Sequence, residues 1–359
     1  MSITSNALVL TGALLCFSAF SNTDAHTEFS QTYHAYQRAV ENNEYEKIAQ
    51  LAKLAYEQGK VVFGEKSQNA ANLAINYARA LSNNDRQQAL TVLNDAIDVL
   101  TALQGKHSPE LVDPYLLKVD LLLPNKDLTA REYVGFAIDI AQHHSNHLLE
   151  SKIYFEAAKL FSRARDYSRV KSYLSRADDI NQKYLPRDAV HRLTVDLWVA
   201  ELLSARKQHK EAIAKLNDLI VVFDEQLDFD HPIELTAHSR LVGLYEKMGM
   251  SEQATKHCVM IAKMTPWRDD IEQTPLYRKE PEYPQSALRA RAQGWVALEF
   301  TITPEGFVED ISVLDKQHGQ LFVKNTINAL KQWRYAPKFE DGKAVSAKST
   351  VRMDFKLSR

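Results

Sequence analysis

Three residue types are scarce in this sequence, and each scarcity excludes a class of protein. Cysteine occurs only at Cys16 and Cys258, and glycine and proline occur 11 times each among 359 residues. Glycine and proline together make up about 6% of the chain, against a typical value of about 12%. This low share excludes collagen-like, low-complexity and turn-rich all-β proteins and favours long helices. Hydrophobic and charged contents of 45% and 25% indicate a globular chain.

Basic residues are absent from the N-terminus, where the first is Arg38. This stretch contains a mostly apolar run of 14 residues, Ala7 to Phe20. Such a run is too short to cross a bilayer core, which needs about 20 residues. We therefore expect residues 1–25 to be a cleaved secretory signal, with an uncleaved N-terminal anchor or a cytoplasmic terminus as alternatives. Removal of the leader would leave Cys258 alone, which excludes an intrachain disulfide and indicates a small buried residue.

An excess of charge of one sign is also lacking. The formal net charge is −2, which argues against a nucleic-acid partner and against binding of the whole chain to anionic membranes. The sequence contains no Walker glycine loop, GxSxG elbow, HExxH helix or dinucleotide fingerprint, so we expect no enzyme, no catalytic residue and no cofactor.

A histidine cluster at His143, His144 and His147 has spacings that could place two imidazoles on one helical face for a metal. The stretch lies between two predicted helices, however, and no nearby cysteine or carboxylate completes a tetrahedral set of ligands. We therefore interpret it as a polar loop and expect no metal site.

Proline, which interrupts helices, is unevenly distributed along the chain. No proline precedes Pro109, whereas six of the eleven follow residue 265. This distribution predicts a helical body at 27–264, a linker at 265–277 and a small turn-rich domain at 278–359. The expected fold is therefore multidomain, with an all-α part followed by an α+β part.

The helical body contains a repeat of about six helix pairs. The second helix of each pair is predicted to begin near Tyr45, Arg86, Arg131, Tyr167, His209 and Ser251. Its apolar anchors are Ile48, Ala89, Val134, Val170, Ala212 and Ala254, at intervals of 41, 45, 36, 42 and 42 residues. The links also recur, since the segment from Gly105 to Leu111 resembles the segment from Asp230 to Leu235. This pattern resembles the longer variant of the tetratricopeptide repeat (TPR), as in kinesin light chains, and implies a stacked solenoid whose groove binds another protein.

The last eighty residues read as a small domain of strands and helices. A segment with two X-Pro steps, Arg278 to Pro284, is followed by a short helix at 285–292 and a strand whose apolar residues alternate from Val296 to Ile302. A turn at 304–306 leads back into a hairpin partner. A helix from Gly319 and a turn at 341–342 precede the final strand, which alternates up to Leu357.

Several motifs in this segment occur together in the order of one family. They are Pro281-x-Tyr283-Pro284, the run from Gly294 to Phe300, Pro304-x-Gly306-x-Val308, and Phe322 through Ala329 to Trp333-Arg334-Tyr335-x-Pro337. The segment resembles the C-terminal domain of the TonB family. Its members are periplasmic proteins that bind the TonB-box peptide of outer-membrane receptors by adding it to a sheet edge.

The resemblance implies a function and a set of binding residues. The sheet edge would be residues 349–357, with backbone contacts at Thr350, Arg352, Asp354 and Lys356, and the second receptor contact would be Pro281, Tyr283 and Pro284. Tyr283 could instead pack in the core, and Trp333 is expected to do so. We therefore expect a periplasmic protein of TonB-dependent transport, with an outer-membrane receptor as one partner and the protein in the repeat groove as another.

Two departures from the family weaken the case for direct energy coupling. Glu280 stands where the best-known members have glutamine, and the long membrane anchor and Pro-rich rod of a full transducer are missing from the pattern. An inner-membrane protein facing the periplasm is the alternative location. The alternative function is a periplasmic scaffold without a role in uptake, in which the free edge docks partners or forms a homodimer.

Overall fold

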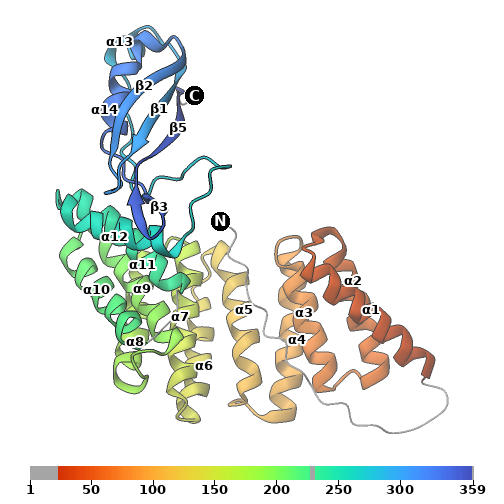
Figure 1. Cartoon of the computed structure of the whole chain (residues 1–359). Coiled ribbons are helices and arrows are strands. Elements are labelled where there is room, and N and C mark those ends of the chain that lie inside the picture. The colour runs from red at the N-terminus through yellow and green to blue at the C-terminus, as the bar shows by residue number, and fades with distance from the viewer. Residues whose placement is uncertain (1–22, 227–230, 358–359) are drawn as a thin grey trace. The chain divides into compact units, whose positions relative to one another are not determined.

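The computed structural model describes residues 23–226 and 231–357 (Figure 1). These residues divide into two compact units, with the boundary between Asp166 and Tyr167. Most of the predicted leader lies outside the described residues, and its last three positions, 23–25, belong to the first helix. Within the described ranges, every helix falls short of the combined length and apolarity needed to span a membrane.

Twelve long helices precede the C-terminal domain among the described residues. The first unit contains α1 (Thr23–Glu41), α2 (Tyr45–Phe63), α3 (Gln68–Leu81), α4 (Arg86–Gln104), α5 (Val112–Leu122), α6 (Ala130–His143) and α7 (His147–Arg163), with the short 3-10 helices η1 (Pro109–Leu111) and η2 (Leu123–Asn125). The second unit begins with α8 (Tyr167–Tyr184), α9 (Val190–Ala205), α10 (His209–Gln226), α11 (Pro232–Lys247) and α12 (Ser251–Met264). The predicted starts of the second helices are confirmed at five positions, and α6 begins one residue early.

The recurring links of the sequence recur in the structure as helix caps. Gly105 ends α4 with φ at +82°, a conformation that favours glycine, and Ser108 then accepts a hydrogen bond from the N–H of Glu110. In the later copy of the link, His231 Nδ1 accepts from the N–H of Ile233 at the start of α11, 3.1 Å away. In both links, the residue before the proline therefore satisfies a free donor at the start of the next helix.

Small and branched apolar side chains fill the space between helices. In the first unit, α3 and α4 bury Ala74, Ala78, Ala89, Leu93 and Leu100 in one core. The second unit has its own core, and Cys258 of α12 is fully buried in it, as predicted. Burial raises the pKa of the Cys258 thiol to about 11, so the thiol is neutral and unreactive at ordinary pH.

The C-terminal domain is a small α+β fold, as predicted. It contains α13 (Gln285–Arg289), β1 (Gly294–Ile302), β2 (Val308–Gln317), η3 (Gly319–Leu321), α14 (Val323–Leu330), β3 (Lys338–Glu340), β4 (Lys343–Val345) and β5 (Ala347–Phe355). Three strands form an antiparallel sheet in the order β2-β1-β5, and β3 and β4 form a separate hairpin. One sheet face packs its alternating apolar residues against α14, with Phe300, Phe322 and Trp333 in the core.

Two short elements differ from the sequence prediction. The helix expected at 285–292 ends at Arg289, where the chain turns through Arg291 at φ +48°. The predicted turn at Asp341 and Gly342 is present, but it joins two strands of three residues each that the sequence pattern did not indicate.

A buried histidine pair in the second unit predicts a pH dependence. Nδ1 of His238 on α11 lies 2.8 Å from Nδ1 of His257 on α12, and the His257 ring stacks on Tyr245. Burial lowers the pKa of both imidazoles, that of His257 to about 4. The unfolded chain therefore binds more protons than the folded chain between pH 6.5 and about 4, and stability falls as the pH drops through that window.

We expect the free energy of unfolding to fall by up to about 1.4 kcal/mol per pH unit from the titration of His257, and the lowered pKa of His238 acts in the same direction. Urea unfolding followed by circular dichroism across the window measures this slope. His257→Asn should reduce the slope, and an unchanged slope in that variant would assign the pH dependence to other groups.

Candidate peptide-binding edge of the C-terminal domain

The strand β5 forms an outer edge of the three-stranded sheet. It pairs with β1 on one side over nine residues, from Gly294 with Phe355 to Ile302 with Ala347, without a shift in register. Its other side carries no strand among the described residues. An edge of this kind presents a row of backbone donors and acceptors that an added strand can pair with.

The alternation along β1 decides which backbone groups of β5 point outward. At the end of β1 next to the turn, the N–H of Thr303 donates to the C=O of Phe307, so the backbone groups of Thr303 point toward β2. Backbone groups alternate in direction along a strand, so those of Thr301, Glu299 and every second residue before them also point toward β2. The residues between them, including Leu298, therefore face β5, and Leu298 is paired with Val351. The backbone groups of Val351 thus bond to β1, whereas those of Arg352 point outward. Lys348, Thr350 and Asp354 have the same orientation as Arg352.

The opposite edge of the sheet, β2, has a different geometry. Its register against β1 slips twice, between Ala297 and Leu298 and between Glu299 and Thr301, and Asp310 lies at φ +50°. Such irregularities twist an edge and interrupt its row of donors and acceptors. Of the two edges, β5 is therefore the more regular template for an extended peptide.

The side chains of the outward positions lie on the exposed face of the sheet. Arg352 lies with its guanidinium 4.2 Å from the centre of the Trp295 ring and pairs with Asp354 at 3.0 Å. Lys348 forms an ion pair with Glu299 at 2.8 Å. Because these pairs are solvent-exposed they contribute little to stability, and they can rearrange around a ligand. Thr350 is exposed on the same face, and Lys356 follows the last strand residue.

Sequence reasoning named the β5 residues but missed their cross-strand neighbours Trp295 and Glu299. Both lie on β1 at positions whose side chains share the exposed face with Arg352 and Thr350. The alternation of apolar residues in β1 could have identified them, since they occupy its outward positions.

The second predicted contact, Pro281 to Pro284, lies against the end of β5. Tyr283 is half-buried, and its hydroxyl donates to the C=O of Ala292 at 2.5 Å. Its ring packs edge-on against Phe322 and Phe355, the last residue of β5. Pro281 and Pro284 are half-buried beside it. The structure therefore brings the two parts of the predicted site together at Phe355, with Tyr283 forming part of the packing.

Trp333 supports this segment from the core. It is 1% exposed, as predicted, and its Nε1–H donates to the C=O of Lys279 at 2.8 Å. The guanidinium of Arg278 lies 5.0 Å from the centre of its ring. The neighbouring Tyr335 is also buried, and this burial raises the pKa of its phenol well above the ordinary value. The backbone leading into Pro281 is thus held by a buried indole.

The three histidines at 143, 144 and 147 lie at the junction of α6 and α7 and have different partners. His143 packs at 4.1 Å between ring centres against His107, which lies 3.1 Å from Asp139, and His144 Nε2 lies 2.8 Å from the C=O of His107. His147 instead lies 3.9 Å from Glu150. Across the described residues, no group of three or more His, Cys, Asp or Glu side chains has a geometry that could hold a metal ion.

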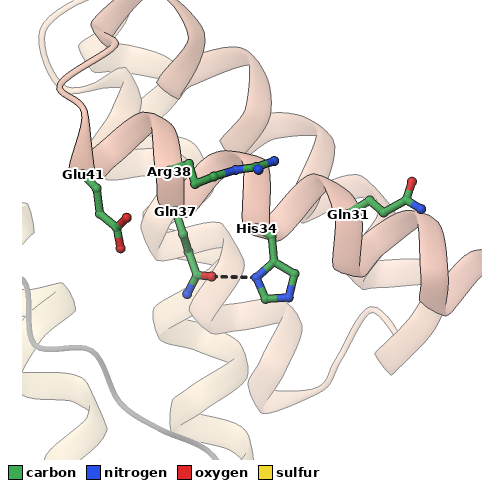
Figure 2. A pocket seen from close by; sticks show the side chains of 5 residues that line it. All are labelled: Gln31, His34, Gln37, Arg38 and Glu41. Carbon is green, nitrogen blue, oxygen red and sulfur yellow. Dashed lines mark hydrogen bonds between the residues drawn. The ribbon is translucent and has the colours of Figure 1, made fainter.

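Two surface hollows lie elsewhere on the molecule. One, of about 510 Å³, is lined by polar residues of α1 alone, and Figure 2 shows their side chains along that helix: Gln31, His34, Gln37, Arg38 and Glu41. The other, of about 240 Å³, is lined by mixed charges that include Lys215, which lies 2.6 Å from Asp196 and 2.9 Å from Asp178. The first hollow is formed by one helix only, and in the second the charged groups largely neutralise one another. Neither hollow therefore defines a ligand as clearly as the edge does.

The C-terminal domain is similar in sequence to known proteins. Residues 279–357 match the family described as Gram-negative bacterial TonB protein C-terminal. Protein TonB of Pseudomonas aeruginosa is 32% identical over 91 residues, which are 25% of this chain and 27% of that protein. The match therefore spans little more than a quarter of that relative.

Solved structures resemble each part of the chain. The solution structure of the Pseudomonas aeruginosa TonB C-terminal domain is 34% identical and covers 25% of this chain and 92% of its own, with a TM-score of 0.22. A putative kinesin light chain of Podosopora anserina with TPR-like repeats is 14% identical and covers 66% of this chain and 95% of its own, with a TM-score of 0.37. Residues 279–357 are thus similar to the C-terminal domain of TonB proteins.

Proposed function

We propose that this protein takes part in TonB-dependent transport across the outer membrane, where its C-terminal domain binds TonB-box-type segments of a receptor by β-augmentation at β5. The observation that carries the proposal is the outward row of backbone groups at Lys348, Thr350, Arg352 and Asp354, on an edge without register slips. An extended peptide gains affinity from such main-chain bonds and specificity from the exposed side chains beside them.

The location follows from this role. A receptor segment that enters from the outer membrane is reached from the periplasm, so we place the protein there, exported by its N-terminal leader. An inner-membrane protein that faces the periplasm is the alternative. The helical repeats supply a second binding surface, and we propose that they hold another protein of the same transport system.

Peptide binding by the full-length chain tests the proposal. We expect calorimetry to detect binding of synthetic peptides that cover receptor TonB-box segments, and no binding of scrambled peptides of the same composition. Because alternate peptide N–H groups would pair with β5, N-methylation at alternate residues should abolish binding in one series and spare it in the other. If the two series of N-methylated peptides bind equally well, the peptide does not bind by adding a strand to the sheet.

A scaffold without a role in uptake is the second candidate, because the same edge of β5 can pair with β5 of a second copy. In that case sedimentation would show a homodimer, and receptor peptides would neither bind nor dissociate it. A monomer that binds the peptides favours the transport role.

A further inference from the structure

Arg334 forms a buried centre of hydrogen bonds that the β5 edge does not use. Its side chain is 1% exposed, and its guanidinium lies 3.8 Å from the centre of the Phe307 ring. A guanidinium carries five N–H donors, and a buried one requires an acceptor for each. The five acceptors are a carboxylate oxygen of Glu246, the C=O of Ser251 at 3.3 Å, Oγ1 of Thr255 at 2.7 Å, the C=O of Glu305 at 2.7 Å and the C=O of Gly306 at 3.3 Å.

These acceptors come from two different parts of the second unit. Glu246 lies on α11 and Ser251 and Thr255 lie on α12, whereas Glu305 and Gly306 form the turn between β1 and β2. Glu246 is itself held, because the Ser251 hydroxyl donates to it at 2.9 Å. One side chain of the C-terminal domain therefore completes a polar network that begins on the last helix pair.

Close packing surrounds this network. Gly306 lies at φ +82°, and a Cβ at this position would be 2.2 Å from the C=O oxygen of Tyr335 and 3.3 Å from Cβ of Cys258 on α12. Only glycine therefore lets the turn approach both the backbone of Tyr335 and α12. Leu276, Tyr277 and Ala336 pack against the buried core of α9–α12. The N–H of Leu276 also donates to the C=O of Arg334 at 2.7 Å.

We propose that Arg334 is a positioning residue that fixes the C-terminal domain on α11 and α12, so that β5 and the last helix pair move as one rigid body. Partial separation would leave the guanidinium and Glu246 buried without partners, which is strongly unfavourable, so the contact is either complete or open. The rigid body thus begins at α11, well before the domain boundary at residue 279. If the proposed function holds, a peptide on β5 and a protein bound by α11 and α12 are kept at a fixed separation.

A distance measurement on the full-length chain tests this rigid connection. Spin labels at Lys256→Cys on α12 and Lys324→Cys on α14, both exposed positions, report the separation when Cys16 is replaced with Ser and Cys258 with Ala. We expect a narrow distance distribution in this background, and a distribution at least about twofold broader after Arg334→Gln. The matched control is Arg240→Gln, which removes an exposed Arg–Glu ion pair between α9 and α11.

A second variant tests the same connection if Arg334→Gln does not fold. Glu246→Leu with Thr255→Val removes two acceptors from the helix side while Arg334 stays, and circular dichroism confirms that the helices are retained. Broadening in either folded variant, with Arg240→Gln unchanged, supports the proposal, and narrow distributions in both variants overturn it. Peptide titration of the same variants separates the two proposals, because the loss of rigidity should leave the affinity of the β5 edge within about twofold.

Discussion

Arg352→Pro is expected to weaken binding of a receptor peptide by about 10- to 100-fold while the C-terminal domain stays folded. Proline removes the outward N–H of Arg352, which would donate to the added strand, and leaves an acceptor of the peptide without a partner. Such a loss costs about 1–3 kcal/mol, and each 1.4 kcal/mol is tenfold in affinity. Calorimetric titration of the full-length variant with the peptide measures the change.

Two control variants distinguish the effect of losing the backbone N–H from the effect of losing the side chain. Val351→Pro removes an N–H that bonds to Leu298 of β1, so it should unfold the sheet instead of affecting binding alone. Arg352→Ala keeps the N–H and loses only the contacts with Trp295 and Asp354, so its affinity should fall less than threefold or so. If Arg352→Pro binds as tightly as the native chain, the peptide does not pair with β5 at this position.

The helical part of this fold could be predicted closely because its signals are local. The second helix of each pair begins where a repeated polar-to-apolar pattern begins, and Asp85, for example, caps α4 by accepting from the N–H of Gln88. The strand β1 was equally clear, since its buried residues alternate from Val296 to Ile302. Such patterns depend on neighbours a few residues apart, so one sequence contains them in full.

Other features of the site depend on contacts that no local pattern records. The acceptors of Arg334 on α11 and α12 lie 79 to 88 residues before it in the chain. Side-chain alternation also does not reveal which N–H groups of β5 point outward, because that depends on the hydrogen-bonded register with β1. The strands β3 and β4, of three residues each, are too short to show an alternation at all.

Trp333→Ala is expected to lower the free energy of unfolding of the C-terminal domain by about 3–5 kcal/mol. The substitution leaves a cavity where the indole packs beside Tyr335, 6.3 Å between ring centres. It also removes the donor to the C=O of Lys279, which then lacks this partner. Native-state hydrogen exchange of peptides that cover β1 and β5 measures this loss within the full-length chain.

Trp333→Phe is the matched control, because it keeps most of the aromatic volume and removes the N–H. Its cost should be smaller, at about 1–3 kcal/mol, and should appear most clearly in faster exchange around Lys279 and Pro281. If both variants lose the same stability, the hydrogen bond dominates and the ring packing adds little. If exchange is unchanged in both, Trp333 does not hold the core, and the segment from Pro281 to Pro284 is held by its other bonds, which include those of Tyr283 and Asn325.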